Sequence, residues 1–183
     1  MTAASAKLNC ALALVNAAAE MTTHGQSVNA SLEAWFRSEH SPCRMVGFWV
    51  ELEGVETFVS VHFSRHKIGV DHFVLSNRDD RGGNGTEGRN TPVNHGMTIN
   101  AQALINMARR RLCYKSHKRT VSAMQKIKLA VGRELPELEK YLVPECVYRN
   151  GICPEFSECK PGLKNVMAAY SYYPELFVKR KRK

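Results

Sequence analysis

The sequence predicts an α+β fold, in which an antiparallel sheet packs against helices. Two observations support this class. Apolar and polar residues alternate over residues 45–52 and 57–63, with Glu53-Gly54 as a turn between them, which predicts a β-hairpin with one buried face. Residues 99–114, after a candidate N-cap at Thr98, repeat their apolar side chains at helical spacing, and a second helix is expected over 118–135. Strands followed by helices are typical of the α+β class.

Local signals predict the remaining elements. Apolar residues recur at helical spacing over 5–21, which predicts an N-terminal helix. Ser31 is expected to be the N-cap of a short helix over 32–37, because its hydroxyl can accept from the first turn. A long glycine-rich loop is expected over 77–97, and another short helix over 137–142.

Length and composition point to one domain with a hydrophobic core over residues 1–183. The chain is 44% hydrophobic and carries a formal net charge of +9, and its basic tail 179–183 is expected to be solvated. The charge favours anionic partners such as nucleotides, nucleic acid or acidic lipid, without choosing among them. No stretch approaches the roughly 20 apolar residues of a membrane span, and no secretion signal is recognisable. We therefore expect a cytoplasmic protein with reduced cysteines and no membrane association.

A basic segment after the predicted hairpin is the first candidate site. Arg65 and Arg78 offer planar guanidinium groups that match phosphate oxygens, His66 and Lys67 add nitrogen donors, and Ser76 adds a hydroxyl. The alternative is a solvated basic loop, whose cations pair with the acidic residues Asp71, Asp79 and Asp80.

The predicted helix from residue 99 carries a polar side opposite its apolar arc. Asn100, Asn106, Arg110 and Arg111 gather there. Asparagine is a poor helix former, and side-chain amides can bind the edge of a planar heterocycle through paired donors and acceptors. The alternative is an ordinary exposed helix face.

These segments, in this order, resemble flavin-dependent thymidylate synthases. The resemblance rests on Glu39-His40-Ser41-Pro42, Arg65-His66-Lys67, Ser76-Asn77-Arg78, the run from Asn100 to Arg111, and the C-terminal pieces 144–146 and 151–159. It covers residues 39–159. The chain is similar to a short, divergent, phage-like member of that family, with the family's α+β fold.

The resemblance implies a methyltransferase of nucleotide biosynthesis. Such a flavoprotein converts dUMP to dTMP with a one-carbon unit from methylenetetrahydrofolate, with FAD as cofactor and NADPH as reductant. The family works as a homotetramer, and a phage-encoded member would act in the host cytoplasm. The alternatives are modification of dCMP or UMP, a basic protein that binds single-stranded nucleic acid through its tail and Tyr170, Tyr172 and Tyr173, or a relative without catalysis.

The resemblance also implies roles for individual residues. For the flavin it implies contacts from Ser41, Arg65, His66, Lys67, Asn100 and Asn106. For the nucleotide substrate it implies contacts from Ser76, Arg78, Arg111 and, beside the base, His62. Arg111 and His62 are the positions expected to act in catalysis.

Three departures from the family pattern leave the exact substrate open. Lys67 replaces an arginine and loses its bidentate fork. The interval from Lys67 to Ser76 is one residue longer than usual, and Asp71-His72-Phe73 stands where the family has an Asn-Glu pair. The region between Arg78 and Asn100 is a glycine-rich loop, too short for the family's helices.

The three cysteines near the C-terminal end are interpreted as buried thiols, and no metal is expected. Cys146, Cys153 and Cys159 are spaced more widely than in a zinc knuckle. The alternative is a four-ligand metal site completed by His117 or Cys113.

Overall fold

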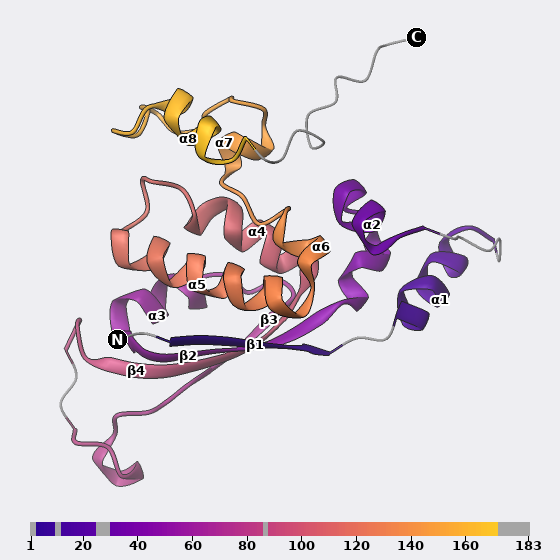
Figure 1. The fold of residues 1–183 in the computed structure, drawn as a ribbon. Coiled ribbons are helices and arrows are strands. Elements are labelled where there is room, and N and C mark those ends of the chain that lie inside the picture. The colour runs from indigo at the N-terminus through magenta and orange to yellow at the C-terminus, as the bar shows by residue number, and fades with distance from the viewer. Residues whose placement is uncertain (1–2, 10–11, 25–29, 86–87, 172–183) are drawn as a thin grey trace.

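A four-stranded antiparallel sheet with helices on one face forms the centre of the protein (Figure 1). This computed structural model describes residues 3–9, 12–24, 30–85 and 88–171. The strand order is β1-β2-β4-β3, and all neighbours are antiparallel. The strands are β1 (Ala3–Asn9), β2 (Gly47–Glu56), β3 (Val70–Val74) and β4 (Pro92–Asn100). The predicted α+β class, an antiparallel sheet packed with helices, is confirmed.

Two helices, α4 (Ala101–Arg111) and α5 (Lys118–Glu134), cover the sheet, and the other helical elements surround them (Figure 1). These other elements are α1 (Leu12–Thr22), α2 (Leu32–Ser38), η1 (Ser41–Met45), α3 (Thr57–Ser64), η2 (Asp79–Arg81), α6 (Pro136–Glu139), α7 (Glu145–Tyr148) and α8 (Leu163–Ala169). In the described part of the chain, no helix combines the length and apolar character that crossing a bilayer requires.

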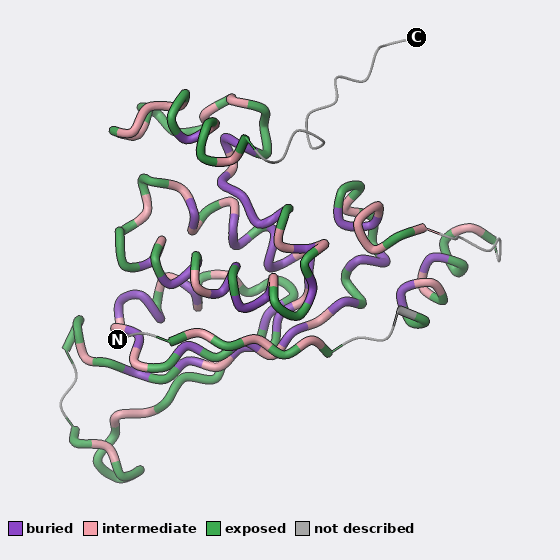
Figure 2. Tube along the Cα trace, in the orientation of Figure 1, coloured by how far each residue is buried: buried purple, intermediate pink, exposed green. Residues whose placement is uncertain are grey.

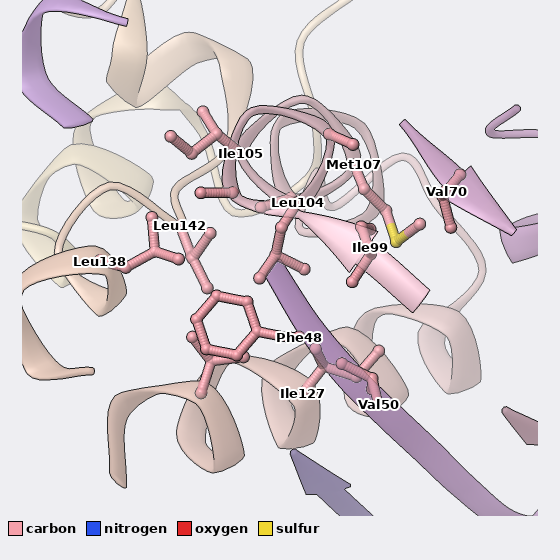
Figure 3. Close-up of a cluster of buried hydrophobic side chains, with 14 of the residues drawn as sticks. Phe48, Val50, Val70, Ile99, Leu104, Ile105, Met107, Ile127, Leu138 and Leu142 are labelled. Atoms are coloured by element: carbon pink, nitrogen blue, oxygen red, sulfur yellow. The ribbon is translucent and has the colours of Figure 1, made fainter. Parts of the chain in front are cut away.

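The main core lies between the sheet and α4 and α5 (Figures 2 and 3). Phe48 and Val50 of β2 project into it, and Leu104 of α4 and Ile127 of α5 meet them there. Each of these side chains is at most 2% exposed, so their burial is a main source of stability. The opposite sheet face carries Trp49, whose ring centroid lies 5.5 Å from that of Phe73.

The predicted hairpin is wrong in its second half. Residues 57–64 form α3, and β2 pairs instead with β1 and β4. Val59 and Phe63 are both fully buried, whereas Val61 is 45% exposed, as helical rather than strand spacing requires. Residues four positions apart, such as Val59 and Phe63, share a face in a helix and in a strand. Over only seven residues the apolar pattern therefore did not discriminate between helix and strand. The Arg65-His66-Lys67 segment therefore follows a helix and not a strand.

The predicted N-terminal helix is also wrong over residues 5–9, which belong to β1. Exposure alternates along β1, and the strand pairs with β2 from Ala3↔Glu53 to Asn9↔Gly47. Tertiary pairing thus overrides the helical propensity of alanine and leucine, and only the later part of the predicted helix is helical, as α1.

Among the other predicted elements, the N-cap at Ser31 is confirmed, whereas the long loop and the last helix are shorter than predicted. Ser31 caps α2 by accepting from Ala34 N at 3.2 Å. The predicted loop from 77 ends early, because residues 92–100 form β4 and Asn100, not Thr98, caps α4. The helix predicted over 137–142 is the short α6. The basic tail 179–183, with Tyr172 and Tyr173, lies outside the described residues.

Leu104→Ala should lower the free energy of unfolding by about 2–5 kcal/mol, because it opens a cavity between α4 and the sheet. Leu104 is fully buried, whereas Leu129 of α5 is 56% exposed. Leu129→Ala is the matched control and should change stability by about 0.5 kcal/mol or less. Urea unfolding measures both, and equal losses would contradict the described core.

Candidate functional site

Cationic and imidazole side chains gather where the end of α4 meets α3 and the start of α5. We call this group the basic cluster, and it comprises His62, Arg65, His66, Arg89, Arg111 and His117. Arg111 donates from Nε to His66 Nε2 at 2.9 Å. His62 Nδ1 is hydrogen-bonded to Thr120 Oγ1 at 2.8 Å. These two hydrogen bonds link α4 to the segment after α3, and α3 to α5.

The basic cluster is electrostatically unfavourable by itself. Burial, then Arg111 and other neighbouring cations, lowers the pKa of His66 to about 4. Burial lowers the pKa of Arg111 too, with Arg65 and Arg110 adding repulsion. His62 shows the same direction, from burial and then Arg111 and Arg65. An anion bound among these groups would relieve the repulsion, so the cluster has the charge of a phosphate or carboxylate site.

A chain of partly buried hydrogen bonds leads from the backbone of His66 to Ser60. His72 Nε2 lies 2.7 Å from the carbonyl oxygen of His66, and His72 Nδ1 lies 2.9 Å from His95 Nε2. His95 Nδ1 lies 2.9 Å from Ser60 Oγ. A carbonyl only accepts, so His72 donates from Nε2 to His66. We call this chain the histidine relay.

Two of the residues predicted to contact the flavin, Lys67 and Asn100, line a groove that is separate from the basic cluster. Both line a groove with Trp49, Asp71 and Thr98 at the end of β4. Asn100 Oδ1 accepts from Ala103 N at 2.9 Å, so this amide is the N-cap of α4 rather than part of a helix face. Lys67, which precedes β3, and Asn100, which ends β4, therefore both border the groove.

Gly69 permits the close approach between the two sides of this groove. The Gly69 carbonyl accepts from Asn100 N at 3.0 Å. Gly69 has φ +73, and a Cβ there would lie 2.4 Å from Asn100 Nδ2. Only glycine fits both the backbone conformation and the space.

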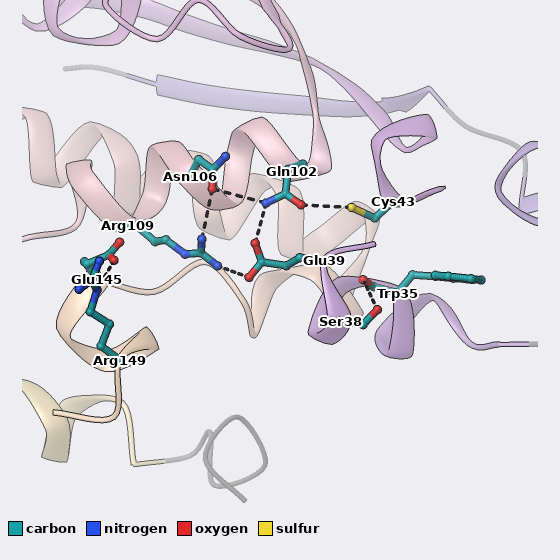
Figure 4. A network of polar contacts seen from close by, with 9 residues as sticks. All are labelled: Trp35, Ser38, Glu39, Cys43, Gln102, Asn106, Arg109, Glu145 and Arg149. Atoms are coloured by element: carbon teal, nitrogen blue, oxygen red, sulfur yellow. Dashed lines mark hydrogen bonds and ion pairs between the residues drawn. The ribbon is translucent and has the colours of Figure 1, made fainter. Parts of the chain in front are cut away.

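Asn106 belongs to a third group of polar residues (Figure 4). Glu39 forms an ion pair with Arg109 and accepts from Gln102 Nε2 at 2.6 Å. Asn106 Oδ1 accepts from Arg109 at 3.2 Å and from Gln102 at 3.4 Å. Ser41 is exposed and begins η1, two residues after Glu39 in the sequence. The oxygen of the Asn106 amide thus bonds within the protein.

Ser76 and Arg78 lie on the loop between β3 and β4, which extends from the sheet away from α4 and α5 (Figure 1). Arg78 donates from Nε to Asp80 Oδ1 at 2.8 Å, and Ser76 Oγ accepts from Arg78 N at 3.3 Å. The structure therefore brings together His62, Arg65, His66 and Arg111, but it does not bring Ser76 and Arg78 to them. Pairing with Asp80 is what the alternative of a solvated loop predicted for Arg78.

Sequence reasoning missed several members of these groups. Arg89 lies in the predicted loop, yet its guanidinium carbon lies 5.0 Å from the centroid of the Phe58 ring, next to His62. Thr120, His72 and His95 showed no motif. The one available signal was the departure from the family pattern at Asp71-His72-Phe73, because His72 is part of the histidine relay.

Comparisons with known proteins define the fold. No protein-family model matches the sequence, and no curated protein matches it. Among solved structures, the UMP/dUMP methylase PolB from Streptomyces cacaoi, bound with 5-Br dUMP, matches with a TM-score of 0.60 at 12% identity. That match covers 77% of this chain and 94% of PolB.

A second solved structure is thymidylate synthase X (ThyX) from Helicobacter pylori with FAD and dUMP. It matches with a TM-score of 0.62 at 14% identity, over 78% of this chain and 98% of that chain. The chain therefore has a ThyX-like fold, as the resemblance in the sequence implied. At these identities the likeness shows the fold alone, which PolB and ThyX share with this chain.

His95→Gln should weaken the acid sensitivity of folding. Burial, with His72 nearby, lowers the pKa of His95 from 6.5 to about 4, so the unfolded chain binds this proton more readily. Stability from the neutral ring is present above about pH 6.5 and is lost as pH falls toward 4, by at most about 1.4 kcal/mol per pH unit. Unfolding by urea at several pH values should show a shallower loss in the variant.

Ser60→Ala is the control for His95→Gln. It removes the hydroxyl at the end of the histidine relay but keeps the buried ring, so the steep acid dependence should remain. Parallel pH curves for the wild type and His95→Gln would contradict the assignment.

Proposed function

We propose that this protein is a flavin-dependent methylase of a pyrimidine nucleotide. The reaction would add a one-carbon unit from methylenetetrahydrofolate to C5 of the base, most simply dUMP to dTMP, with UMP or dCMP as alternatives. The observation that carries the proposal is Arg111 bonded to neutral His66 within the basic cluster, on a ThyX-like fold. PolB and ThyX, which share this fold, were solved with 5-Br dUMP and with dUMP.

The donors present fit an anionic dinucleotide such as FAD. Arg65, His66 and Lys67 would contact its phosphates or ring, together with Asn100 of the groove. Two buried donors, Trp35 Nε1 and Arg109 Nε, have no partner within the described ranges, and Arg109 belongs to the network with Asn106. Bound FAD, reduced by NADPH, would supply the hydride that the protein's own side chains lack.

The chain's own residues would bind and orient the nucleotide. Arg111 would hold a negatively charged group of the substrate, since its direction is fixed by the bond to His66. His62 would lie beside the base. Its lowered pKa keeps the imidazole neutral at pH 7, so the ring can donate or accept a hydrogen bond, and Thr120 fixes its orientation.

Assembly into a homo-oligomer, with a tetramer expected, would complete the site. Ser76 and Arg78 would contact the nucleotide phosphate, but within one chain they lie on the loop that extends away from the basic cluster. The free sheet face also carries exposed apolar side chains, with Phe73 55% and Leu75 58% exposed. Apolar surface of this kind favours contact with another subunit. A partner chain would then place its Arg78 loop at the basic cluster.

The function is tested with the purified full-length chain. We expect yellow protein, or protein that becomes yellow on reconstitution with FAD. After reduction with NADPH and addition of methylenetetrahydrofolate, one of dUMP, UMP and dCMP should gain a methyl group, detected by mass. Colourless protein that does not take up FAD, yet shifts single-stranded DNA with a steep salt dependence, would instead support the nucleic-acid-binding alternative.

Arg111→Ala and Arg78→Ala should each weaken nucleotide binding about 10- to 100-fold, as expected for a lost charge-assisted hydrogen bond. Arg111→Lys should restore only part of the affinity, because lysine lacks the planar fork. Calorimetric titration with the accepted nucleotide measures these constants. Arg133→Ala, on the exposed end of α5, is the control and should bind normally.

Mixing the two variants tests whether the site is shared between chains. If Arg78 and Arg111 of one site come from different subunits, random pairing across a two-fold interface restores about a quarter of wild-type activity. No recovery on mixing would place both residues in one chain. Unchanged affinity in Arg78→Ala would show that the loop lies outside the site.

A further inference from the structure

Four cysteines, one after α4 and three from residues 146–159, line one small cavity. Cys113 follows α4, Cys146 lies in α7, and Cys153 and Cys159 lie in the segment between α7 and α8. All four are free thiols, and the cavity between them and their neighbours has a volume of about 20 Å³. His117, the other fourth ligand considered from the sequence, instead packs its ring 4.7 Å from the centroid of the Phe58 ring.

The lining of this cavity suits a cation that prefers sulfur. The four cysteines line it together with apolar residues such as Pro144, Leu163 and Val166. Zinc and other soft cations bind sulfur ligands, whereas Mg²⁺ and Ca²⁺ prefer oxygen.

The segment around these cysteines has little core of its own. Its buried residues form a small cluster apart from the main core, with Val143, Cys146, Val147 and Val166 as members. Two short helices, α7 and α8, and the connecting turns make up the described part of this segment to residue 171. Segments with so little apolar burial usually need a cross-link or a metal to stay ordered.

We propose that Cys113, Cys146, Cys153 and Cys159 bind one structural zinc ion, which fastens the segment from Pro144 to Ser171 to the end of α4. Four sulfur ligands complete the tetrahedral coordination of zinc and leave no open position, so the site is structural and not catalytic. The charged residues around the same cavity are of both signs, three basic and three acidic: Arg109, Arg110, Lys115, Glu145, Glu155 and Glu158.

The thiols stand in an open arrangement in this structure. Within the described ranges, no group of three or more histidine, cysteine, aspartate or glutamate side chains is positioned to hold a metal. Binding would therefore turn the four sulfurs inward into the cavity, to about 2.3 Å from the ion. It would also release the thiol protons, so affinity falls as pH falls.

The first test uses the full-length protein expressed with added zinc. Elemental analysis should find one zinc per chain, and X-ray absorption should show four sulfur neighbours at about 2.3 Å. Replacement with Co²⁺ should give the intense thiolate charge-transfer bands of a tetrahedral sulfur site. Zinc at background level, disulfides between these cysteines, iron with sulfide, or oxygen ligands from Glu155 or Glu158 would each overturn the proposal.

Cysteine variants locate the site. Cys113→Ser and Cys159→Ser should each lose the zinc, measured per folded chain. Cys43→Ser is the matched control, because Cys43 is also buried but contacts Gln102 beside Glu39, outside the cavity. Zinc retained by Cys113→Ser, or lost from Cys43→Ser, contradicts the assignment.

A chelator experiment on the wild-type chain keeps the proposal testable if the variants do not fold. Removing zinc should speed proteolysis within residues 144–171 and lower the melting temperature, and Zn²⁺, but not Mg²⁺, should reverse both changes. Unchanged proteolysis and melting after complete removal would overturn the structural role. These measurements need neither flavin nor nucleotide, so their outcome is independent of the proposed methylase activity.

Discussion

The junction between β4 and α4 is the constraint on which the rest of the structure depends. At this junction Asn100 ends the strand and caps the helix, and its N–H bonds to the carbonyl of Gly69. The next residue, Ala101, donates from its N–H to the carbonyl of Val46 at 2.8 Å. The start of α4 is thereby tied to the segments before β2 and β3. Because a helix is stiff, the direction set here determines where Arg111 lies one helix length later.

Arg111 lies close to other cations, and the contacts within the protein offset the resulting repulsion only in part. The histidine relay keeps the backbone of His66 in place, and the neutral His66 ring accepts from Arg111. No proton is added to this ring near neutral pH, because burial and the cations lower its pKa. The remaining repulsion among Arg65, Arg110 and Arg111 costs stability in the free protein. If the proposed nucleotide binds here, its phosphate would offset this repulsion.

The correct predictions of secondary structure rest on signals between residues close in sequence, and the errors arise where strands pair over long distances in the sequence. The cap at Ser31 and the apolar arc of α4 involve residues three or four positions apart, so the sequence predicted both. Strands β1 and β4 form because they pair with β2 across about a quarter of the chain in each case, which no local pattern reveals. The basic cluster was predicted through residue types at Arg65, His66 and Arg111. The relay through His95 was not, because its partners lie 23 and 35 positions away.

Helix α4 connects the two proposed sites physically. Arg111 in its last turn faces the basic cluster, and Cys113, two residues later, borders the cysteine cavity. Arg109, two residues before the end of the helix, forms an ion pair with Glu39, and its guanidinium carbon lies 3.5 Å from the centroid of the Tyr148 ring in α7. The end of α4 is therefore held on one side by the C-terminal segment. Helix ends fray unless they are anchored, so an ion fixing Cys113 would also limit the motion of Arg111. A structural zinc would thus help keep the guanidinium in place for the nucleotide without touching it.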